Sequence, residues 1–272
     1  MKKLLCLLLA MMLVGCSSST SEGSTTTETT KDTFTVGMEC DYAPFNWTQV
    51  EDSETAVKIS DVDYCDGYDV VMATRIANEL GLELQVKKVS WDNLIPSINN
   101  GDIDAIIAGM TDTEERRQEV DFTDPYYASQ MVVIVKADSD LVNISDIQEL
   151  SGKKVMGQLA TLYDDVIDQI DGVIHMTPQD AYPRMVLALN EGEVDAITAE
   201  MPVAQGVVAA NEGLAIVTFE EGHGFVADTT VSIALAKNSE LKDQINDILS
   251  NISQDERNQI MLDATDRQPA TN

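Results

Sequence analysis

The chain has 272 residues, and its 47 acidic side chains outnumber its 17 basic ones, which gives a formal net charge of −30 at pH 7. A chain this acidic is repelled by nucleic acids and by anionic lipid surfaces, which argues against both as partners. Its two histidines are isolated and its four cysteines form no CxxC pair, so the sequence predicts no metal site.

The first residues have the pattern of an export signal. Two lysines precede an apolar run, Leu4–Val14, that is too short to span a membrane comfortably. The tetrapeptide Leu13–Cys16 resembles a bacterial lipobox, which implies cleavage before Cys16 and acylation of that cysteine; an ordinary signal peptide with a chance cysteine is the alternative. We expect residues 1–15 to be a lipoprotein signal peptide. The mature protein is then extracytoplasmic, at the cell surface or in the periplasm, and anchored to the cell membrane by its N-terminal lipid.

Residues 16–33 are expected to form a lipid-anchored flexible tether. After Cys16 this stretch is rich in Ser, Thr and Glu and has no apolar side chain to bury. A flexible coil of this length reaches roughly 20–25 Å. The part of the chain from residue 34 onward exceeds what one core usually holds, which favours one large or two modest domains.

Beyond the tether, strand-like and helix-like segments alternate. A short strand, Phe34–Met38, precedes a polar excursion between Tyr42 and Tyr68 that we interpret as a surface hairpin. Asp66 is the expected cap of a helix with apolar residues at helical spacing from Val70 to Leu80. The alternation continues with a strand over Leu82–Val86, a short helix that ends at Gly101 and a buried strand over Ile103–Ala108. This order predicts the α/β class.

The second half of the chain repeats the same theme. We expect strands over Lys154–Gly157 and Val194–Thr198, and helices over Thr161–Ile170, Gln179–Asn190 and Met201–Ala210. The final segment, Ser239–Leu262, has one apolar face and is interpreted as a single helix.

Two stretches of the chain echo each other. IPSINNGDIDAIIAGM at 95–110 and VLALNEGEVDAITAEM at 186–201 share seven identities at a constant offset of 91. Common packing needs of two helix–Gly–strand units explain the glycine and the apolar matches, but not easily the whole register. We therefore infer two lobes of similar design. Ligands of such sheets bind beyond the carboxyl ends of the strands, so Gly109 and Glu200 are expected on opposite walls of one cleft.

One turn of the first lobe is suited to bind an anion. Arg116 is expected in the first turn of a helix whose capping box is Thr111 with Glu114. A guanidinium stays charged and offers a planar fork of donors, and a helix N-terminus adds positive potential. Arg116, together with the turn from Gly109 to Thr111, is predicted to hold a carboxylate. The neighbouring Arg117 is the alternative.

The opposite wall supplies groups for the rest of an α-amino acid. Glu200 is the candidate for its ammonium, with capping of the following helix as the alternative role. Tyr42 and Trp91 lie at turns of the first lobe and would clamp a side chain between aromatic faces, unless Trp91 belongs to the core. Glu39 would favour a positive side chain, with cation–π support, unless it is a charge at the rim.

Cys40 and Cys65 lie near the two ends of the expected hairpin. Export permits a disulfide between them. Two buried free thiols are the alternative, and the sequence leaves both open.

These motifs resemble those of the bacterial extracellular solute-binding proteins of family 3, the polar amino acid receptors of ABC importers. The matching stretches, in family order, are Asp41–Phe45 (DYAPF), Gly67–Gly81, Leu94–Tyr127 and Gly192–Ala204. The resemblance implies an α/β, two-lobed, periplasmic-binding-protein-like (type II) fold with two hinge crossings, which we place near Tyr126–Gln130 and Ala227–Val231.

The resemblance also implies roles for particular residues. Arg116 would bind the ligand carboxylate, and the Glu200 position, where many members have Asp, would bind the α-ammonium. The remaining implied contacts come from Gly109 and Thr111 and from a sandwich of the side chain by Tyr42 and Trp91. In the family's second-lobe ligand loop, at Gln158–Thr161 here, only Thr161 carries over, because Ala160 and Leu162 replace usual residues.

The expected organisation is a first lobe over residues 34–126 plus 231–272 and a second lobe over residues 127–230. The implied function is binding of a polar L-amino acid, either cationic or neutral, and its delivery to permease subunits in the membrane. We expect a monomer without cofactor or catalytic residue. The alternatives are a dehydratase on the same fold and the sensor module of a receptor. Which amino acid is bound stays open, with arginine or lysine ahead of a neutral polar ligand.

Overall fold

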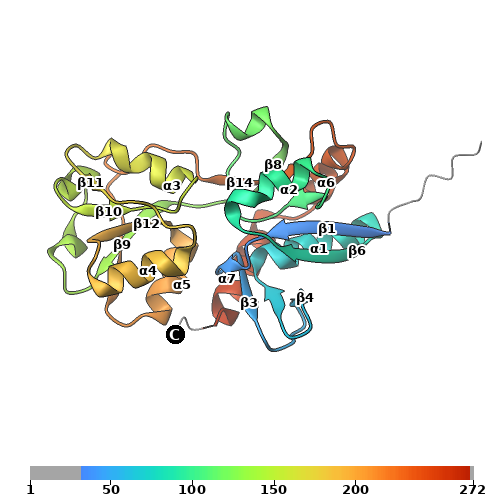
Figure 1. The fold of residues 1–272 in the computed structure, drawn as a ribbon, viewed down its shortest axis with the longest axis horizontal. Coiled ribbons are helices and arrows are strands. Elements are labelled where there is room, and N and C mark those ends of the chain that lie inside the picture. Colours follow the sequence, from blue (N-terminus) through green and yellow to red (C-terminus); the bar gives the residue numbers. More distant parts are fainter. Residues whose placement is uncertain (1–31, 270–272) are drawn as a thin grey trace, which may run out of the picture. The chain divides into compact units, whose positions relative to one another are not determined.

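The computed structural model describes residues 32–269 (Figure 1). The expected signal peptide, the acylated Cys16 and nearly all of the tether lie outside the described residues. Across residues 32–269, no helix has both the length and the apolar character needed to cross a membrane.

The first lobe is built on a five-stranded sheet of order β6-β1-β7-β14-β8. Four of its strands run in the same direction, and β14 runs antiparallel to both of its neighbours. The strands are β1 (Thr33–Met38), β6 (Glu83–Lys88), β7 (Ala105–Ile106), β8 (Asp121–Ala128) and β14 (Thr230–Leu235). The helices are α1 (Tyr68–Leu80), η1 (Trp91–Asn93), α2 (Leu94–Asn99), η2 (Arg116–Gln118), α6 (Leu241–Ser250) and α7 (Gln254–Arg267), where η marks a 3₁₀-helix.

The second lobe has a five-stranded sheet of the same design, with order β11-β10-β12-β9-β13. Its strands are β9 (Met131–Lys136), β10 (Lys154–Met156), β11 (Ile174–His175), β12 (Ala196–Glu200) and β13 (Leu214–Val217). Its helices are η3 (Asp140–Asn143), η4 (Ile147–Leu150), α3 (Leu162–Asp165), η5 (Val166–Gln169), α4 (Tyr182–Glu191) and α5 (Met201–Ala210). Strand β9 is a continuous apolar run because it lies between β12 and β13 and is buried on both faces.

The chain crosses between the two large sheets twice, as predicted for this fold. The first crossing joins β8 to β9 through Ser129 and Gln130, within the expected range. The second joins β13 to β14 through residues 218–229, so it begins earlier than expected. The two-lobed α/β fold is therefore confirmed, while the lobe boundaries at 126/127 and 230/231 stay predictions.

The internal echo corresponds to two equivalent βα units. Asp104 accepts a hydrogen bond from the backbone N–H of Thr35 at 2.8 Å, and Asp195 accepts one from the N–H of Lys154 at 2.7 Å. Gly101 and Gly192 precede these aspartates with φ angles of 77° and 76°, the left-handed conformation that glycine adopts at low cost. The shared register thus follows from the same helix stop and the same strand entry in each lobe.

Three expected helices differ from the structure. The helix expected over Thr161–Ile170 is the short α3 followed by the 3₁₀-helix η5. Asp66 does not cap α1: it is the last residue of a strand, and its carboxylate accepts hydrogen bonds from Gly67 N–H and from the hydroxyls of Ser53 and Thr55. The single C-terminal helix is in fact two, α6 and α7, because the chain breaks at Asn251–Ser253 and the Ser253 hydroxyl caps α7.

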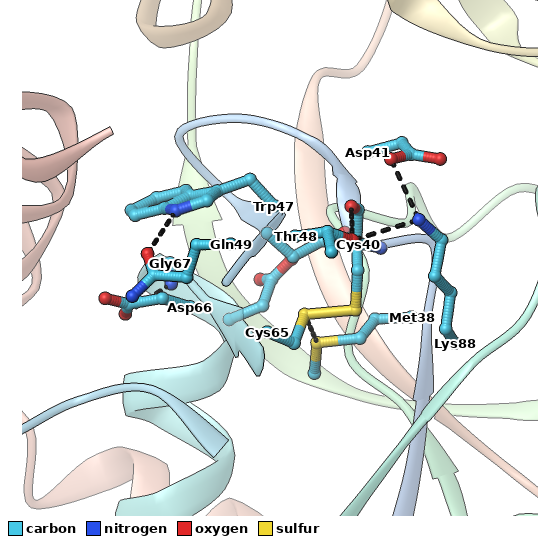
Figure 2. The surroundings of a disulfide bond; sticks show 12 residues. Met38, Cys40, Asp41, Trp47, Thr48, Gln49, Cys65, Asp66, Gly67 and Lys88 are labelled. Atoms are coloured by element: carbon cyan, nitrogen blue, oxygen red, sulfur yellow. Dashed lines mark hydrogen bonds and ion pairs between the residues drawn. A yellow bond between two sulfur atoms is a disulfide. The ribbon is translucent and has the colours of Figure 1, made fainter. Parts of the chain in front are cut away.

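The expected surface hairpin is part of a four-stranded sheet of order β2-β3-β5-β4. Its strands are β2 (Asp41–Tyr42), β3 (Asn46–Gln49), β4 (Val57–Lys58) and β5 (Tyr64–Asp66). Figure 2 shows a disulfide within it, between Cys40 and Cys65, whose Cα atoms are 5.8 Å apart. Both cysteines are fully buried, so the bond ties the start of β2 to β5 inside the protein.

We expect the disulfide to stabilise the first lobe. It closes a loop with a sequence separation of 25, for which the chain-entropy relation gives about 3.5 kcal/mol. Adding a reductant should therefore lower the Tm by several degrees. The Cys65→Ser variant should start from the lower Tm and be insensitive to reductant. Equal Tm values for the oxidised and reduced protein would contradict the expectation.

Candidate functional site

A small cavity lies between the two lobes. The first lobe lines it with Glu39, Tyr42, Trp91, Gly109, Thr111 and Arg116, and the second with Gln158, Thr161, Leu162 and Tyr163. Seven of the eight predicted ligand residues are thus brought together, and Glu200 is the exception. The cavity measures about 10 Å³, which is the space of about one water molecule. Any larger ligand must displace side chains or part the lobes.

Arg116 reaches the cavity from a 3₁₀ turn rather than from an α-helix. The expected capping box is wrong: Thr111 forms a β-bridge with Val231, and the Thr113 hydroxyl accepts the N–H of Arg116 at 3.2 Å. The turn nevertheless points the guanidinium inward. Arg117 points out, where it is largely exposed and forms an ion pair with Asp112 at 2.6 Å.

The Arg116 guanidinium is half-buried and has no carboxylate partner among residues 32–269. Its Nη1 donates to the Thr111 carbonyl at 2.8 Å and its Nη2 to the Ala160 carbonyl at 3.1 Å, and it lies 5.1 Å from the centre of the Trp91 ring. Burial lowers its pKa, an effect that Asp165 opposes by its negative charge. A positive charge with only neutral acceptors around it is ready for an anion.

The Ala160 carbonyl is a contact point between the lobes. It accepts hydrogen bonds from both Arg116 and the indole N–H of Trp91, the latter at 3.0 Å. Ala160 has a φ of 59°, which is uncommon for a residue with a side chain. This backbone conformation belongs to the loop 158–161 that also carries Thr161.

Glu200 is fully buried at the end of β12. It stands at the N-cap position of α5, but its side chain forms no capping hydrogen bond. Instead it accepts a hydrogen bond from the Tyr42 hydroxyl of the first lobe. Tyr42 therefore separates Glu200 from the cavity.

No cation balances Glu200 among the described residues. Burial raises its pKa to about 8, with a further contribution from the negative charge of Asp69, and the hydrogen bond from Tyr42 opposes this shift. Its second oxygen, Oε2, has no hydrogen-bond partner, and neither do the buried hydroxyl oxygens of Tyr163 and Ser129. These two hydroxyls lie close enough to Glu200 to favour its ionised form and so lower its pKa, although they are outside hydrogen-bonding geometry.

A second buried carboxylate faces the cavity at Glu39, which is 7% exposed. The Gln158 amide of the second lobe donates to its two oxygens at 3.2 and 3.3 Å. Burial raises the pKa of Glu39 to about 7, with Asp41 and Asp180 adding to the shift, while Gln158 and Lys88 oppose it. A positive ligand group would relieve this unfavourable charge.

Three predicted contacts have local roles in the structure. The N–H of Gly109 donates to the Tyr126 hydroxyl at 3.0 Å, so it is engaged within the first lobe. The Thr161 hydroxyl donates to the Gln158 carbonyl at 2.7 Å and fixes the loop that begins α3. Trp91 and Tyr42 do not form an open sandwich, because Arg116 covers one ring and Phe45 stacks on the other at 5.4 Å.

The family model of the bacterial extracellular solute-binding proteins, family 3, matches residues 34–263. The chain belongs to this family. It is 33% identical over 205 residues to a probable histidine-binding protein of Campylobacter jejuni, covering 75% of this chain and 74% of that protein. It is 27% identical over 251 residues to the arginine-binding extracellular protein ArtP of Bacillus subtilis, covering 92% of each.

A solved structure agrees with the family assignment. The amino acid ABC transporter substrate-binding protein AbpA from Streptococcus pneumoniae, bound to L-arginine, superposes with a TM-score of 0.75 at 29% sequence identity. The match covers 86% of this chain and 95% of that one. These three relatives bear names of binding proteins rather than of enzymes.

Two residues of the site in this solute-binding protein are not predictable from sequence patterns. Gln158 carries no periodic signal because it is an amide in a loop, yet it meets Glu39 across the cleft. Tyr163 follows the expected loop and places its hydroxyl beside Glu200. Among residues 32–269, no group of His, Cys, Asp or Glu side chains is arranged to hold a metal ion.

We expect the protein without ligand to become more stable as the pH falls from 8 to 5.5. In the folded state Glu200 has a pKa of about 8 and Glu39 and Asp69 of about 7, far above the values of about 4 in an unfolded chain. In this window the folded state binds protons that the unfolded state releases, so the free energy of unfolding rises as the pH falls. Thermal unfolding across this pH range measures the effect.

Glu200→Gln should remove part of this pH dependence, because it removes a group that takes up a proton on folding. Glu212→Gln is the matched control, since it changes the same charge at an exposed position. An unchanged slope in Glu200→Gln would contradict the assignment.

Proposed function

We propose that this protein is the lipid-anchored substrate-binding component of an ABC importer and that it binds a cationic L-amino acid between its lobes, with L-arginine as the first candidate. The observation that carries the proposal is a pair of opposite charges on facing lobes, with Glu200 fully buried and Arg116 half-buried. Neither the guanidinium of Arg116 nor the carboxylate of Glu200 has an oppositely charged partner among the described residues.

This pair matches the backbone of a zwitterion. Arg116 would bind the α-carboxylate through its fork of N–H groups, after giving up its bond to Ala160. Glu200 would bind the α-ammonium. The Tyr42 hydroxyl, which donates to the Oε1 atom of Glu200, must then release that oxygen or share it with the ammonium. The unpaired hydroxyls of Tyr163 and Ser129 supply further polar atoms beside the same group.

The side-chain end of the cavity supports a positive group. Glu39 provides a buried carboxylate, and the amide of Gln158 beside it can accept from a guanidinium through its oxygen. Asp41 and Asp180 add negative potential there, as their effect on the Glu39 pKa indicates. The names of two relatives, an arginine-binding protein of Bacillus subtilis and a receptor bound to L-arginine, support the same class of ligand.

Binding would be coupled to lobe closure. Each lobe would provide part of the ligand contacts: Arg116 and Glu39 lie in the first lobe, and Glu200 and Gln158 in the second. A ligand can make all of these contacts only when the lobes are closed, so it stabilises the closed arrangement selectively. Closure also excludes water, which strengthens the ion pairs. The closed receptor would then deliver its ligand to membrane permease subunits, while acylated Cys16 keeps it at the membrane.

We propose a binding role without catalysis. Neither of the two histidines of the chain lines the cavity. The acidic groups in and beside it are placed to pair with positive ligand groups.

Arg116→Ala should raise the Kd for L-arginine by roughly two to three orders of magnitude, because it leaves a carboxylate buried without its charged partner. Arg117→Ala is the matched control, since it removes the same side chain one position away at the surface, and its Kd should stay within about twofold. Isothermal titration calorimetry measures both, with Tm as the check on folding. Loss of affinity in the Arg117 variant alone would refute the assignment.

The ligand preference should depend on Glu39. In Glu39→Gln the Kd for L-arginine should rise at least about tenfold, whereas the Kd for L-glutamine should change little, because only the cationic side chain loses a charged partner. Titrations with both amino acids measure the ratio. A wild-type preference for glutamate or aspartate would contradict a cationic ligand.

Binding of L-arginine should tighten as the pH rises from 6 to 8. The ligand needs Glu39 and Glu200 ionised, and their pKa values of about 7 and about 8 lie within or at the edge of this range. Binding at pH 7 should therefore release protons, which calorimetry in buffers of different ionisation enthalpy detects. Proton uptake on binding would contradict this account.

A further inference from the structure

The C-terminal helix α7 contacts both lobes. It packs against α1 of the first lobe and against α5 of the second, and Figure 1 shows it between these elements. At its end, Arg267 forms an ion pair at 3.3 Å with Asp66, whose side chain is 2% exposed. This pair fixes the end of α7 to the small sheet of the first lobe.

The next residue, Gln268, lies directly on α5 of the second lobe. A Cβ atom placed on Gly206 would stand 2.3 to 2.8 Å from the side-chain amide of Gln268, which is closer than real Cβ atoms approach. Gly206 lies in the interior of α5, where glycine is unfavourable compared with alanine. The close approach of Gln268 is a physical reason for a glycine at this position.

The lobes are otherwise loosely packed on this side. A cavity of about 330 Å³ separates them, lined by Ala43 and Trp47 of the first lobe, by Leu187 and Val207 of the second, and by Gln268 and Pro269. The Gln268 contact therefore bridges the lobes at the border of an unfilled space. This larger cavity shares no lining residue with the ligand cavity. The two are linked by one ring contact, in which Tyr42 of the ligand cavity packs on Tyr182 of the larger one at 5.8 Å.

The lobes are in a closed arrangement, in which Tyr42 meets Glu200 and Gln158 meets Glu39 across the cleft. We propose that residues Arg267–Pro269 form a C-terminal strap that stabilises this arrangement by seating Gln268 on Gly206. Arg267 holds the strap to the first lobe, and Gln268 reaches the second. A contact between lobes that exists in one arrangement and is lost in another shifts the population toward the first. The strap thus tunes how readily the receptor closes without touching the ligand.

Gly206→Ala tests the strap against simple stability. The new methyl group displaces the flexible end of Gln268, while alanine favours the helix, so the Tm without ligand should stay equal or rise. The Kd for L-arginine should nevertheless rise roughly three- to tenfold, the effect of one lost polar contact. Small-angle X-ray scattering without ligand should show a larger radius of gyration than in the wild type.

The second variant, Gln268→Ala, should reproduce the rise in Kd and the larger radius of gyration. In the double variant Gly206→Ala/Gln268→Ala the effects should not add, because the methyl group acts only through Gln268. A chain that ends at Pro269 is the control and should match the wild type, since it keeps the strap. Additive effects, or an unchanged radius of gyration and Kd in Gln268→Ala, would overturn the proposal. The titration rests on the proposed ligand but the scattering does not, so failure of arginine to bind would leave the strap open to test.

Discussion

The structure depends on one electrostatic constraint: two opposite charges, one fully buried and one half-buried, lie on facing lobes and do not meet. Glu200 ends a strand of the second lobe and Arg116 starts a turn of the first, and the hydrogen bonds of both go to neutral groups. Burying a charge without a partner is costly. The protein reduces this cost by protonation at Glu200, whose pKa is about 8, and by carbonyl contacts at Arg116. A ligand that carries both charges removes the cost at both places.

The small disulfide-bonded sheet belongs to the same arrangement. Cys40 stands between Glu39 and Tyr42, two side chains that line the cavity. Its N–H donates to Asn46 at 2.7 Å, and its carbonyl accepts from the Thr48 hydroxyl at 2.8 Å. Together with the bond to Cys65, these contacts fix the segment that presents Glu39 and Tyr42. A rigid support of this kind lowers the entropy lost when the site orders around a ligand.

How far the sequence predicts this structure depends on the range of the interactions. The echo at Asp104 and Asp195 is visible in the sequence because both aspartates make the same contact. Each accepts a hydrogen bond from the backbone N–H at the start of a neighbouring strand in its own lobe. The turn at Arg116 is predictable from local sequence, but its 3₁₀ form is not, because a distant strand residue, Val231, pairs with Thr111 and removes it from the expected cap. The roles of Gln158 and Ala160 carry no signal in the sequence, since the contacts that bring them to the site cross the cleft. Asp66 was misassigned because its hydroxyl partners, Ser53 and Thr55, come from an irregular loop.

The position of β14 in the first sheet has a consequence for how the chain is completed. β14 lies between β7 and β8, and β8 has no other neighbour in that sheet. The first lobe therefore contains strands from both sides of the second lobe in the sequence, whereas every strand of the second sheet lies between residues 131 and 217. During export the second sheet can form as soon as its own residues emerge. The first must wait for residues 230–235, so the lobe that begins first is the last to be finished.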